Sequence, residues 1–302
     1  MDSRPLKLGT RGSRLALAQA TIVKEQISRI SPHARVELIL IRTAGDGADP
    51  GASSGADRKF AFTHELDRQL LDGDIDAAVH SLKDVPTAID GRLTIAATPA
   101  RGDPRDALVT TSGTVLAGLQ PGSSLGTSSV RRVVQLKMLR TDIRVVDVRG
   151  NVETRIGKMK ERGLEGVVLA AAGLQRLGLA GKASQYFEVD EMVPAACQGT
   201  LAVEARRDDR DVIGLLGRID ERLTHLESDC ERAFLSRLGG DCDFPAGVYA
   251  RAAGSQLKVV GMIADPDGAS VKKGALSGGA SGAERLGAEL ASRLLGAREG
   301  VR

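Results

Sequence analysis

Short apolar strand segments alternate with helical segments through the first two hundred residues, and this alternation restricts the fold more than any other feature. A helical pattern begins after Ser13, and residues 36–41 have the composition of a strand. Further strands are expected near residues 75–79, 93–97, 107–110, 143–148 and 167–170, and further helices near 62–72, 128–140 and 151–162. Such alternation is typical of α/β proteins, in which ligands bind at the carboxyl ends of strands. We therefore predict two α/β units in series.

The last third of the chain has a different order of elements. We expect a helix at about 221–238, strands near 247–252, 257–264 and 270–275, and a helix at about 281–296. A chain of 302 residues is also too long for one ordinary hydrophobic core. We predict three domains, which comprise residues 1–100 with 199–218, residues 101–198, and residues 219–302. The strand near 201–204 is expected to return the chain to the first domain, and the third domain is expected to be α+β.

Two segments are candidates for movement. Residues 44–58 form the longest stretch without a helix or strand pattern, which is typical of a lid or a disordered loop. Residues 101–108 cross between the first two predicted domains, and their Gly and Pro suit a hinge. The charged residues of this second segment are expected to pair locally.

Composition excludes several classes of protein. No apolar run approaches the roughly 18 residues of a membrane span, and no signal-peptide pattern is present, so we expect a cytoplasmic protein without a membrane partner. The chain has no Trp and two Tyr, which argues against single-stranded nucleic acid, because such binding depends on aromatic stacking. The four His are scattered and no two of the three Cys have zinc-ligand spacing, so we expect no metal site. Nothing in the sequence requires a protein partner.

Arginines stand at junctions between strands and helices, beside Gly, Ser and Thr. After Gly126, a helix begins whose first turn holds Arg131 and Arg132. Its candidate N-caps are Thr127, Ser128 and Ser129. Cations in a first turn oppose the helix dipole by about 0.3–1 kcal/mol each, so the pair indicates a bound anion. The alternative is an incidental pair on a solvated surface.

The same layout recurs elsewhere in the chain. The other junction residues are Arg11 with Ser13, Arg149, Arg155 next to the predicted cap Asn151, and Arg176. Arg rather than Lys favours bidentate pairing with carboxylates or phosphates. No P-loop or Gly-x-Gly-x-x-Gly pattern is present, which disfavours a nucleotide.

Lys83 and Asp84 follow an apolar strand segment and are followed by Pro86. Asp84 is therefore expected at the carboxyl end of a strand, where a carboxylate can act as a general acid or stabilise a developing cation. The alternative is an ordinary Lys–Asp pair on the surface. His80 is isolated in the sequence, so we interpret it as structural.

Cys242 lies in a turn that contains Gly, Asp and Pro, whereas Cys230 falls in a helical pattern. A free Cys is usually a small buried hydrophobe, and Cys230 fits this interpretation. A thiol in a turn can instead carry a covalent group. Together with the arginines, Cys242 indicates an enzyme that builds a polyanionic product while holding it covalently.

These segments closely resemble the porphobilinogen deaminase family, also called hydroxymethylbilane synthase, over nearly the whole chain. The matching segments are residues 8–17, 79–86, 103–107, 126–132, 149–155, 172–178, 198–199 and the Cys242 turn. Agreement of several separate motifs in one order is specific. The resemblance implies two α/β domains similar to periplasmic binding proteins and a smaller C-terminal α+β domain, in a monomer.

The resemblance also implies a chemistry. A dipyrromethane cofactor would be held by a thioether to Cys242, four porphobilinogen molecules would be added with loss of ammonia, and hydrolysis would free hydroxymethylbilane. Asp84, with Lys83, is the implied catalytic group. The implied cofactor-binding residues are Cys242, Lys83, Asp84, Thr127, Ser128, Ser129, Arg131, Arg132 and Gly173. The substrate carboxylates are assigned to Arg11, Ser13, Arg149, Arg155, Arg176 and Gln198.

Four positions depart from the family pattern, namely Phe60, His64, Cys197 and Asp241. Asp241 precedes Cys242, where a carboxylate disfavours the thiolate. Two other functions stay open, a solute-binding protein of the same two-lobed architecture and an inactive paralogue that binds carboxylates. Turnover of porphobilinogen distinguishes the enzyme from both.

Overall fold

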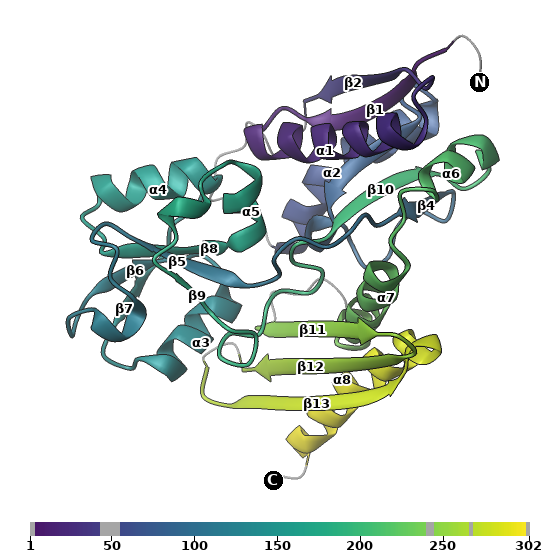
Figure 1. The fold of residues 1–302 in the computed structure, drawn as a ribbon. Coiled ribbons are helices and arrows are strands. Elements are labelled where there is room, and N and C mark those ends of the chain that lie inside the picture. Colours follow the sequence, from purple (N-terminus) through teal and green to yellow (C-terminus); the bar gives the residue numbers. More distant parts are fainter. Residues whose placement is uncertain (1–3, 43–54, 240–244, 266–267, 300–302) are drawn as a thin grey trace.

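The computed structural model describes residues 4–42, 55–239, 245–265 and 268–299, and these residues form three sheets (Figure 1). The first sheet has the strand order β2-β1-β3-β10-β4. Its elements are β1 (Leu6–Arg11), α1 (Arg14–Ile30), β2 (Val36–Ile41), α2 (Gly55–Asp72), β3 (Ala77–Ser81), β4 (Leu93–Ala97), β10 (Leu201–Arg206) and α6 (Arg210–Leu216). β1 runs parallel to β2 and β3, whereas β10 runs antiparallel to β3 and β4.

The second sheet repeats this topology. Its order is β7-β6-β8-β5-β9, with β6 parallel to β7 and β8, and β5 antiparallel to β8 and β9. Its elements are β5 (Asp106–Thr110), β6 (Ser124–Gly126), α3 (Val130–Leu139), β7 (Arg144–Val146), α4 (Val152–Glu161), β8 (Gly166–Ala170), α5 (Ala171–Arg176) and β9 (Gln185–Tyr186). In each sheet the antiparallel strand is the one that enters from the other sheet. The predicted return of the chain to the first sheet through the strand near 201–204 is confirmed.

The two crossing segments, 98–105 and 187–200, touch each other at glycines. The backbone N–H of Gly102 donates to the carbonyl of Gly199 at 3.1 Å. Gly199 has a φ of +91°, and a Cβ at this position would lie 2.6 Å from the carbonyl oxygen of Gly102. Any other residue would therefore strain the backbone and collide with the opposite segment. Glycine at position 199 allows the two connections between the sheets to lie in contact.

Side-chain caps begin two of the helices that follow strand ends. Ser13 Oγ accepts the backbone N–H of Ala16 at 3.2 Å, and Asn151 Oδ1 accepts that of Thr154 at 2.8 Å. Each bond satisfies a donor that has no partner within its own helix. The caps predicted at Ser13 and Asn151 are confirmed.

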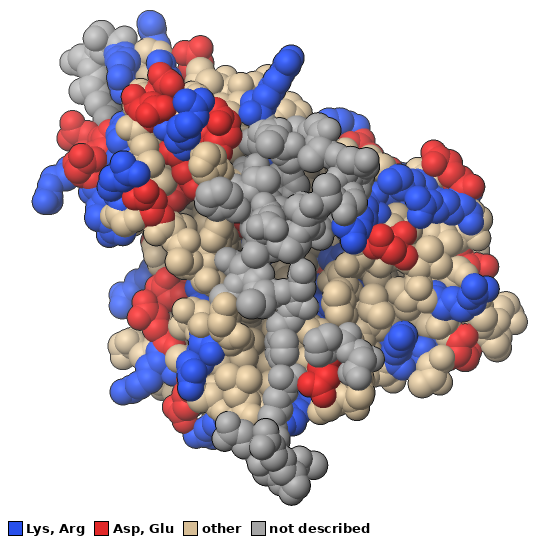
Figure 2. Space-filling model, turned by 180° about the vertical axis from the view of Figure 1, so that it is seen from behind, with Lys and Arg blue, Asp and Glu red and all other residues tan. Residues whose placement is uncertain are grey.

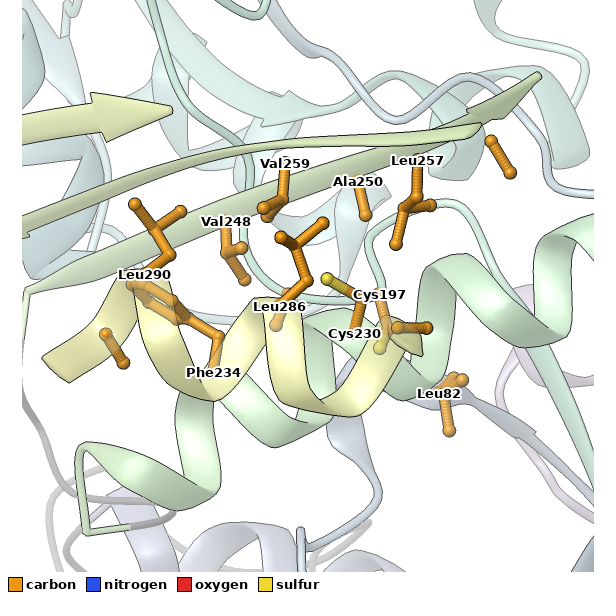
Figure 3. Close-up of a cluster of buried hydrophobic side chains, with 14 of the residues drawn as sticks. Leu82, Cys197, Cys230, Phe234, Val248, Ala250, Leu257, Val259, Leu286 and Leu290 are labelled. Atoms are coloured by element: carbon orange, nitrogen blue, oxygen red, sulfur yellow. The ribbon is translucent and has the colours of Figure 1, made fainter. Parts of the chain in front are cut away.

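The last part of the chain forms an antiparallel sheet of the order β11-β12-β13, with two helices against it. Its elements are α7 (Arg222–Arg237), β11 (Ala246–Ala253), β12 (Gln256–Ala264), β13 (Val271–Gly279) and α8 (Ala283–Glu299). Figure 3 shows the core between the helices and the sheet, where Phe234, Leu286 and Leu290 pack with Val248 and Val259. Short 3-10 turns complete the described elements, namely η2 (Leu82–Asp84), η3 (Leu116–Gly118), η4 (Ala180–Lys182) and η5 (Ala280–Gly282).

The predicted fold class, two α/β units and a smaller α+β unit, is confirmed by these sheets. The expected loop at 44–58 is too long, because α2 already begins at Gly55; residues 43–54 lie outside the described residues. The domain boundaries stay a prediction. Among the described residues, no helix has both the length and the apolar composition that a membrane crossing requires.

Candidate active site

Lys83 and Asp84 lie in the single 3-10 turn η2, which follows directly after β3 ends at Ser81. Burial lowers the pKa of Lys83 to about 8, although the negative charge of Asp84 acts in the opposite direction. Asp84 is partly buried, and its carboxylate has no hydrogen-bond partner among the residues that the structure describes. A carboxylate held beside a cation, with its oxygens uncommitted, is available to a ligand.

Gln198 connects this turn to the second sheet. Its side-chain oxygen lies 3.5 Å from Lys83 Nζ, within hydrogen-bond distance. Its side-chain nitrogen donates to the carbonyl of Pro104 at 2.8 Å and to Asp106 Oδ1 at 2.9 Å. The side chain is almost fully buried, at 1% exposure. Gln198, which the family resemblance implies as a substrate contact, therefore already has protein partners on both sides.

Arg131 and Arg132 are buried, and both bind the carboxylate of Asp106. Arg131 Nη1 donates to Asp106 Oδ2 at 2.7 Å, and Arg132 donates through Nε at 3.0 Å and Nη2 at 2.7 Å to Oδ1. Burial alone would raise the pKa of Asp106, but the two guanidinium groups hold it well below its usual range. The alternative that Arg131 and Arg132 form an incidental pair on the solvated surface is therefore wrong. The predicted anion at the start of this helix is, at least in part, the carboxylate of Asp106.

The two arginines differ in what they still offer a ligand. All three nitrogens of the Arg132 guanidinium donate within the protein, since Nη1 binds the carbonyl of Val168 at 2.9 Å. Arg131 uses only Nη1, which also donates to the carbonyl of Val193 at 2.7 Å. Its Nε and Nη2 have no hydrogen-bond partner in the described part of the chain. Of the two, Arg131 has more capacity for a carboxylate of a bound molecule.

Arg155 and Arg176 are partly buried, and both bind carbonyl groups of the main chain. Arg155 Nε donates to Gly150 at 2.7 Å, and Arg176 Nη2 donates to Gly199 at 2.5 Å. Burial lowers the pKa of each to about 10. Asp84 and Arg132 both influence Arg155 electrostatically, which places it in the same region as η2 and α3.

Arg176 has no ion pair with a carboxylate of the described residues. A guanidinium that is withdrawn from water without an opposite charge is costly, and an anionic ligand would compensate it. Arg149 differs from Arg176, because its Nε lies 3.0 Å from a carboxylate oxygen of Asp147.

The first turns of α1, beside the first sheet, and of α4, beside the second sheet, are in contact with each other. Arg14 of α1 forms an ion pair with Glu153 of α4. A Cβ added at Gly173 of α5 would lie 3.5 Å from Val152 and 3.9 Å from Leu15, so Gly173 lies between these helices. Arg11 is partly buried at the end of β1, two residues before the cap Ser13.

The hydroxyl groups at the start of α3 differ in their use. Thr127 is buried, and its Oγ1 accepts the backbone N–H of Ser129 at 3.2 Å. Ser129 occupies the N-cap position, but its side chain makes no capping bond. In the described chain, the hydroxyls of Ser128 and Ser129 have no hydrogen-bond partner. These two groups, beside a helix N-terminus, are suited to an acidic ligand.

The charged partners that the sequence did not predict come from distant segments. Residues 101–108 were expected to pair locally, and this is correct for Arg105 with Asp103, at 2.8 Å. It is wrong for Arg101, which binds both oxygens of Glu231 on α7, at 2.7 and 3.1 Å. It is wrong for Asp106 as well. No local pattern could have indicated these partners.

Figure 2 shows Lys and Arg interspersed with Asp and Glu on the face that it presents, in keeping with a net charge of +3. The arginines of the site are distinguished by burial and by their position at strand ends. Phe60, Asp241 and Cys242 have side chains outside the described residues, and His64 is exposed on α2.

Comparison with known proteins identifies similar chains over nearly the whole length. A family model described as "Porphobilinogen deaminase, dipyromethane cofactor binding domain" matches residues 6–214, and one described as "Porphobilinogen deaminase, C-terminal domain" matches residues 225–296. The porphobilinogen deaminase of Syntrophomonas wolfei is 46% identical, covering 97% of this chain and 95% of the relative. That of Roseiflexus sp. is 43% identical, covering 96% and 95%.

Solved structures with a similar chain path include an arginine-specific periplasmic binding protein of Salmonella typhimurium. It is 13% identical, with a TM-score of 0.40, and the alignment covers 74% of this chain and 94% of that one. The VFT2 domain of Bordetella pertussis BvgS is 15% identical, with a TM-score of 0.40 and coverage of 71% and 85%. These likenesses are too weak to support an argument about function.

Proposed function

Because the chain belongs to the porphobilinogen deaminase family of transferases and carries its dipyrromethane cofactor-binding domain, we propose that it catalyses the hydroxymethylbilane synthase reaction. In this reaction, four porphobilinogen molecules are joined head to tail on an enzyme-bound dipyrromethane primer. Each addition forms one carbon–carbon bond and releases one ammonia. Hydrolysis then frees the linear tetrapyrrole.

The observation that supports this proposal most is the set of partly buried cations around an uncommitted carboxylate. Arg155 and Arg176 bind main-chain carbonyls only, and Asp84 has no hydrogen-bond partner among the described residues. Each porphobilinogen brings an acetate and a propionate, so negative charge grows with each addition. Arginine forks suit these carboxylates. We assign the substrate carboxylates to Arg11, Ser13, Arg149, Arg155, Arg176 and Gln198.

The same region fits a bound dipyrromethane. This group supplies the pyrrole carbon to which the first substrate is joined. We assign its carboxylates to Arg131, with Lys83, Arg132 and the N–H and hydroxyl groups of Thr127, Ser128 and Ser129. Gly173 leaves space between the helix starts. Of these, Arg131, Ser128 and Ser129 have donors without a partner in the described chain, which supports a ligand at this place.

Cys242 is the proposed attachment point, and it lies outside the described residues. The environment of the other two cysteines supports this assignment. Among the described residues, Cys197 and Cys230 form no disulfide, and both are buried in the core shown in Figure 3. Burial raises the pKa of Cys230 to about 12, which keeps its thiol protonated, and the thiolate is the reactive form.

Asp84 is proposed as the catalytic group, and Lys83 as its partner. When the substrate loses ammonia, positive charge develops on the pyrrole. A carboxylate at hydrogen-bond distance from the pyrrole nitrogen would stabilise this charge, and a protonated Asp84 could assist the departure of the amine. Lys83 is the cation next to this carboxylate in the turn η2.

The mass of the intact protein tests the proposed attachment. We expect the denatured wild-type chain to be heavier than its sequence by two linked pyrrole units, and Cys242→Ala to have the sequence mass. Cys230→Ser serves as the control, and the folded variant should retain the excess mass. An unmodified wild-type chain that also gains no mass on incubation with porphobilinogen would contradict the enzyme and favour an inactive paralogue or a solute-binding protein.

Arg155→Leu is expected to stall elongation, because it removes a partly buried cation beside Asp84 without removing an ion pair of the core. Mass spectrometry of the enzyme after a short incubation should show intermediates that accumulate with fewer added pyrroles than in the wild type. Arg162→Leu, at the opposite end of the same helix, is the control, because Arg162 is exposed and its guanidinium binds only the carbonyl of Asp147 among the described residues. Normal elongation in Arg155→Leu would contradict the carboxylate assignment.

Substrate and product are the partners that the proposal requires. A location in the cytoplasm and the lack of a nucleic acid or obligate protein partner stay predictions.

A further inference from the structure

A second cluster of titratable side chains lies where α2 packs against the strands β3 and β10, and β3 is the strand that leads to Lys83 and Asp84. It consists of His80 on β3, Glu204 on β10 and Asp67 on α2. One ligand atom from each residue lies within 4.8 Å of the other two. His80 and Glu204 are 6% and 2% exposed, and Asp67 is partly buried. The proposed reaction does not use this cluster.

When both acids are ionised, the cluster has buried hydrogen-bond acceptors for which it has no donors. Asp67 Oδ1, both Glu204 oxygens and His80 Nε2 are buried without a hydrogen-bond partner. His80 Nε2 lies 3.3 Å from Glu204 Oε2, but the two atoms do not form a hydrogen bond. Carboxylates only accept, so neither acid can satisfy the other. Unsatisfied buried acceptors are rare, because each costs about 1–3 kcal/mol.

Few other charges reach the cluster. The groups that act on Asp67 are Glu204, His80 and the hydroxyl of Thr63, and they come from β10, β3 and α2. Arg206 lies two residues after Glu204 on β10, but its guanidinium binds Asp209 at 2.9 Å and the carbonyls of Leu70 and Ile75. Two buried negative charges therefore face one imidazole, with no arginine or lysine of the described residues bound to them.

A single proton reduces both problems, because it pairs two of these four buried atoms and neutralises one of the two acids. Placed on one carboxyl group, it turns an acceptor–acceptor contact into an O–H···O⁻ hydrogen bond, which belongs to the strong, charge-assisted class. It also removes one of the two buried negative charges. We propose that Asp67 and Glu204 share one proton, and that this pair, with His80, is a positioning contact that ties α2 to the strand end carrying Lys83 and Asp84.

The electrostatics of Asp67 agree with the geometry. Burial, together with the charge of Glu204, raises the pKa of Asp67 from 3.8 to about 7. The folded protein therefore binds more protons than the unfolded chain between these two values. Stability falls as the pH rises through this interval and levels off above it.

The positioning role rests on the proposed function, whereas the shared proton does not. α2 packs against β3, β10 and η2, the turn that holds Lys83 and Asp84. His80 lies only three residues before Lys83 on the same strand end. When the proton leaves, two carboxylates repel each other across the contact between α2 and β10. Lys83 and Asp84 then lose part of the support that holds them in place.

The shared proton is tested with Asp67→Asn, whose amide can donate to Glu204 at any pH. Infrared spectra at pH 6 should contain the C=O band of a protonated carboxylic acid that is absent from this variant and from Glu204→Gln. Between pH 4 and pH 7, the folded-to-unfolded ratio of the wild type should fall relative to Asp67→Asn, by at most about tenfold per pH unit. Asp72→Asn, an exposed acid on the same helix, should behave as the wild type. Absence of the band, or parallel pH dependence in wild type and Asp67→Asn, would overturn the proposal.

The positioning role is tested by the pH dependence of porphobilinogen turnover. Because burial lowers the pKa of Lys83 to about 8, we expect a loss of activity at alkaline pH in every variant. The wild type should lose activity at lower pH than Asp67→Asn, and the shift should appear in kcat rather than in KM. If turnover depends on pH in the same way in the wild type and in Asp67→Asn, the positioning role is wrong. That result would not contradict the shared proton. Elemental analysis gives a separate outcome, since one divalent metal ion per wild-type chain, absent from Asp67→Asn, would overturn the shared proton.

Discussion

Replacement of Asp84 by Ala should lower the turnover of porphobilinogen by about 10²- to 10⁴-fold, the range typical of a lost acid–base group. The carboxylate lies at the end of β3, beside Lys83 and within the electrostatic reach of Arg155. No other carboxylate among the described residues influences both of these cations from the same turn. Single-turnover kinetics with the cofactor-loaded enzyme measures the effect directly.

The fold of Asp84→Ala should be intact, because the Asp84 carboxylate makes no hydrogen bond within the described chain whose loss would destabilise it. Its thermal midpoint should lie close to that of the wild type. Asp90→Ala is the matched control, since Asp90 is six residues away and pairs with Arg92 on the surface. Wild-type turnover in Asp84→Ala would contradict the role that we assign to it.

Replacement of Asp106 by Ala should destabilise the protein by about 3–5 kcal/mol, the range for a broken buried ion pair. The variant leaves the guanidinium groups of Arg131 and Arg132 buried without their carboxylate, and the Gln198 amide loses one acceptor. The loss should appear as a lower urea midpoint with an unchanged slope.

The control for this prediction is Asp142→Ala. Asp142 accepts two hydrogen bonds from Arg140, at 2.7 Å each, but the carboxylate of Asp142 is exposed to solvent. Its loss should therefore cost much less than that of Asp106, because solvent can replace the carboxylate. Equal effects of the two substitutions would show that burial does not set the strength of the Asp106 cluster.

The elements of the site could be predicted where the signal is local. Ser13 and Asn151 cap their helices because the acceptor and the donor are three residues apart. Lys83 and Asp84 follow a strand because an apolar segment ends there and Pro86 stops it. The sequence predicts that α2 begins near residue 62, whereas this helix begins at Gly55. The existence of a helix can be predicted more reliably than its first residue.

The partners that charged residues find in distant segments could not be predicted. Asp103 and Asp106 stand in the same short segment, but Asp103 pairs with Arg105 while Asp106 turns toward α3. Asp106 is the first residue of β5, and successive side chains of a strand point to opposite faces of its sheet, so its carboxylate need not face that of Asp103. The cluster of Asp67, His80 and Glu204 is a stronger case, because it combines three elements, and His80 alone looked structural.

The sequence by itself determined the fold class, the strand ends, the helix caps and the family, since periodicity, capping and motif order are properties of residues close together in the chain. Only the tertiary structure decided which charge meets which. Arg101 and Glu231 are 130 residues apart, and their contact exists because a crossing segment packs against α7. Ion pairs act over a few ångströms in space, and no local pattern specifies which distant segments will come that close.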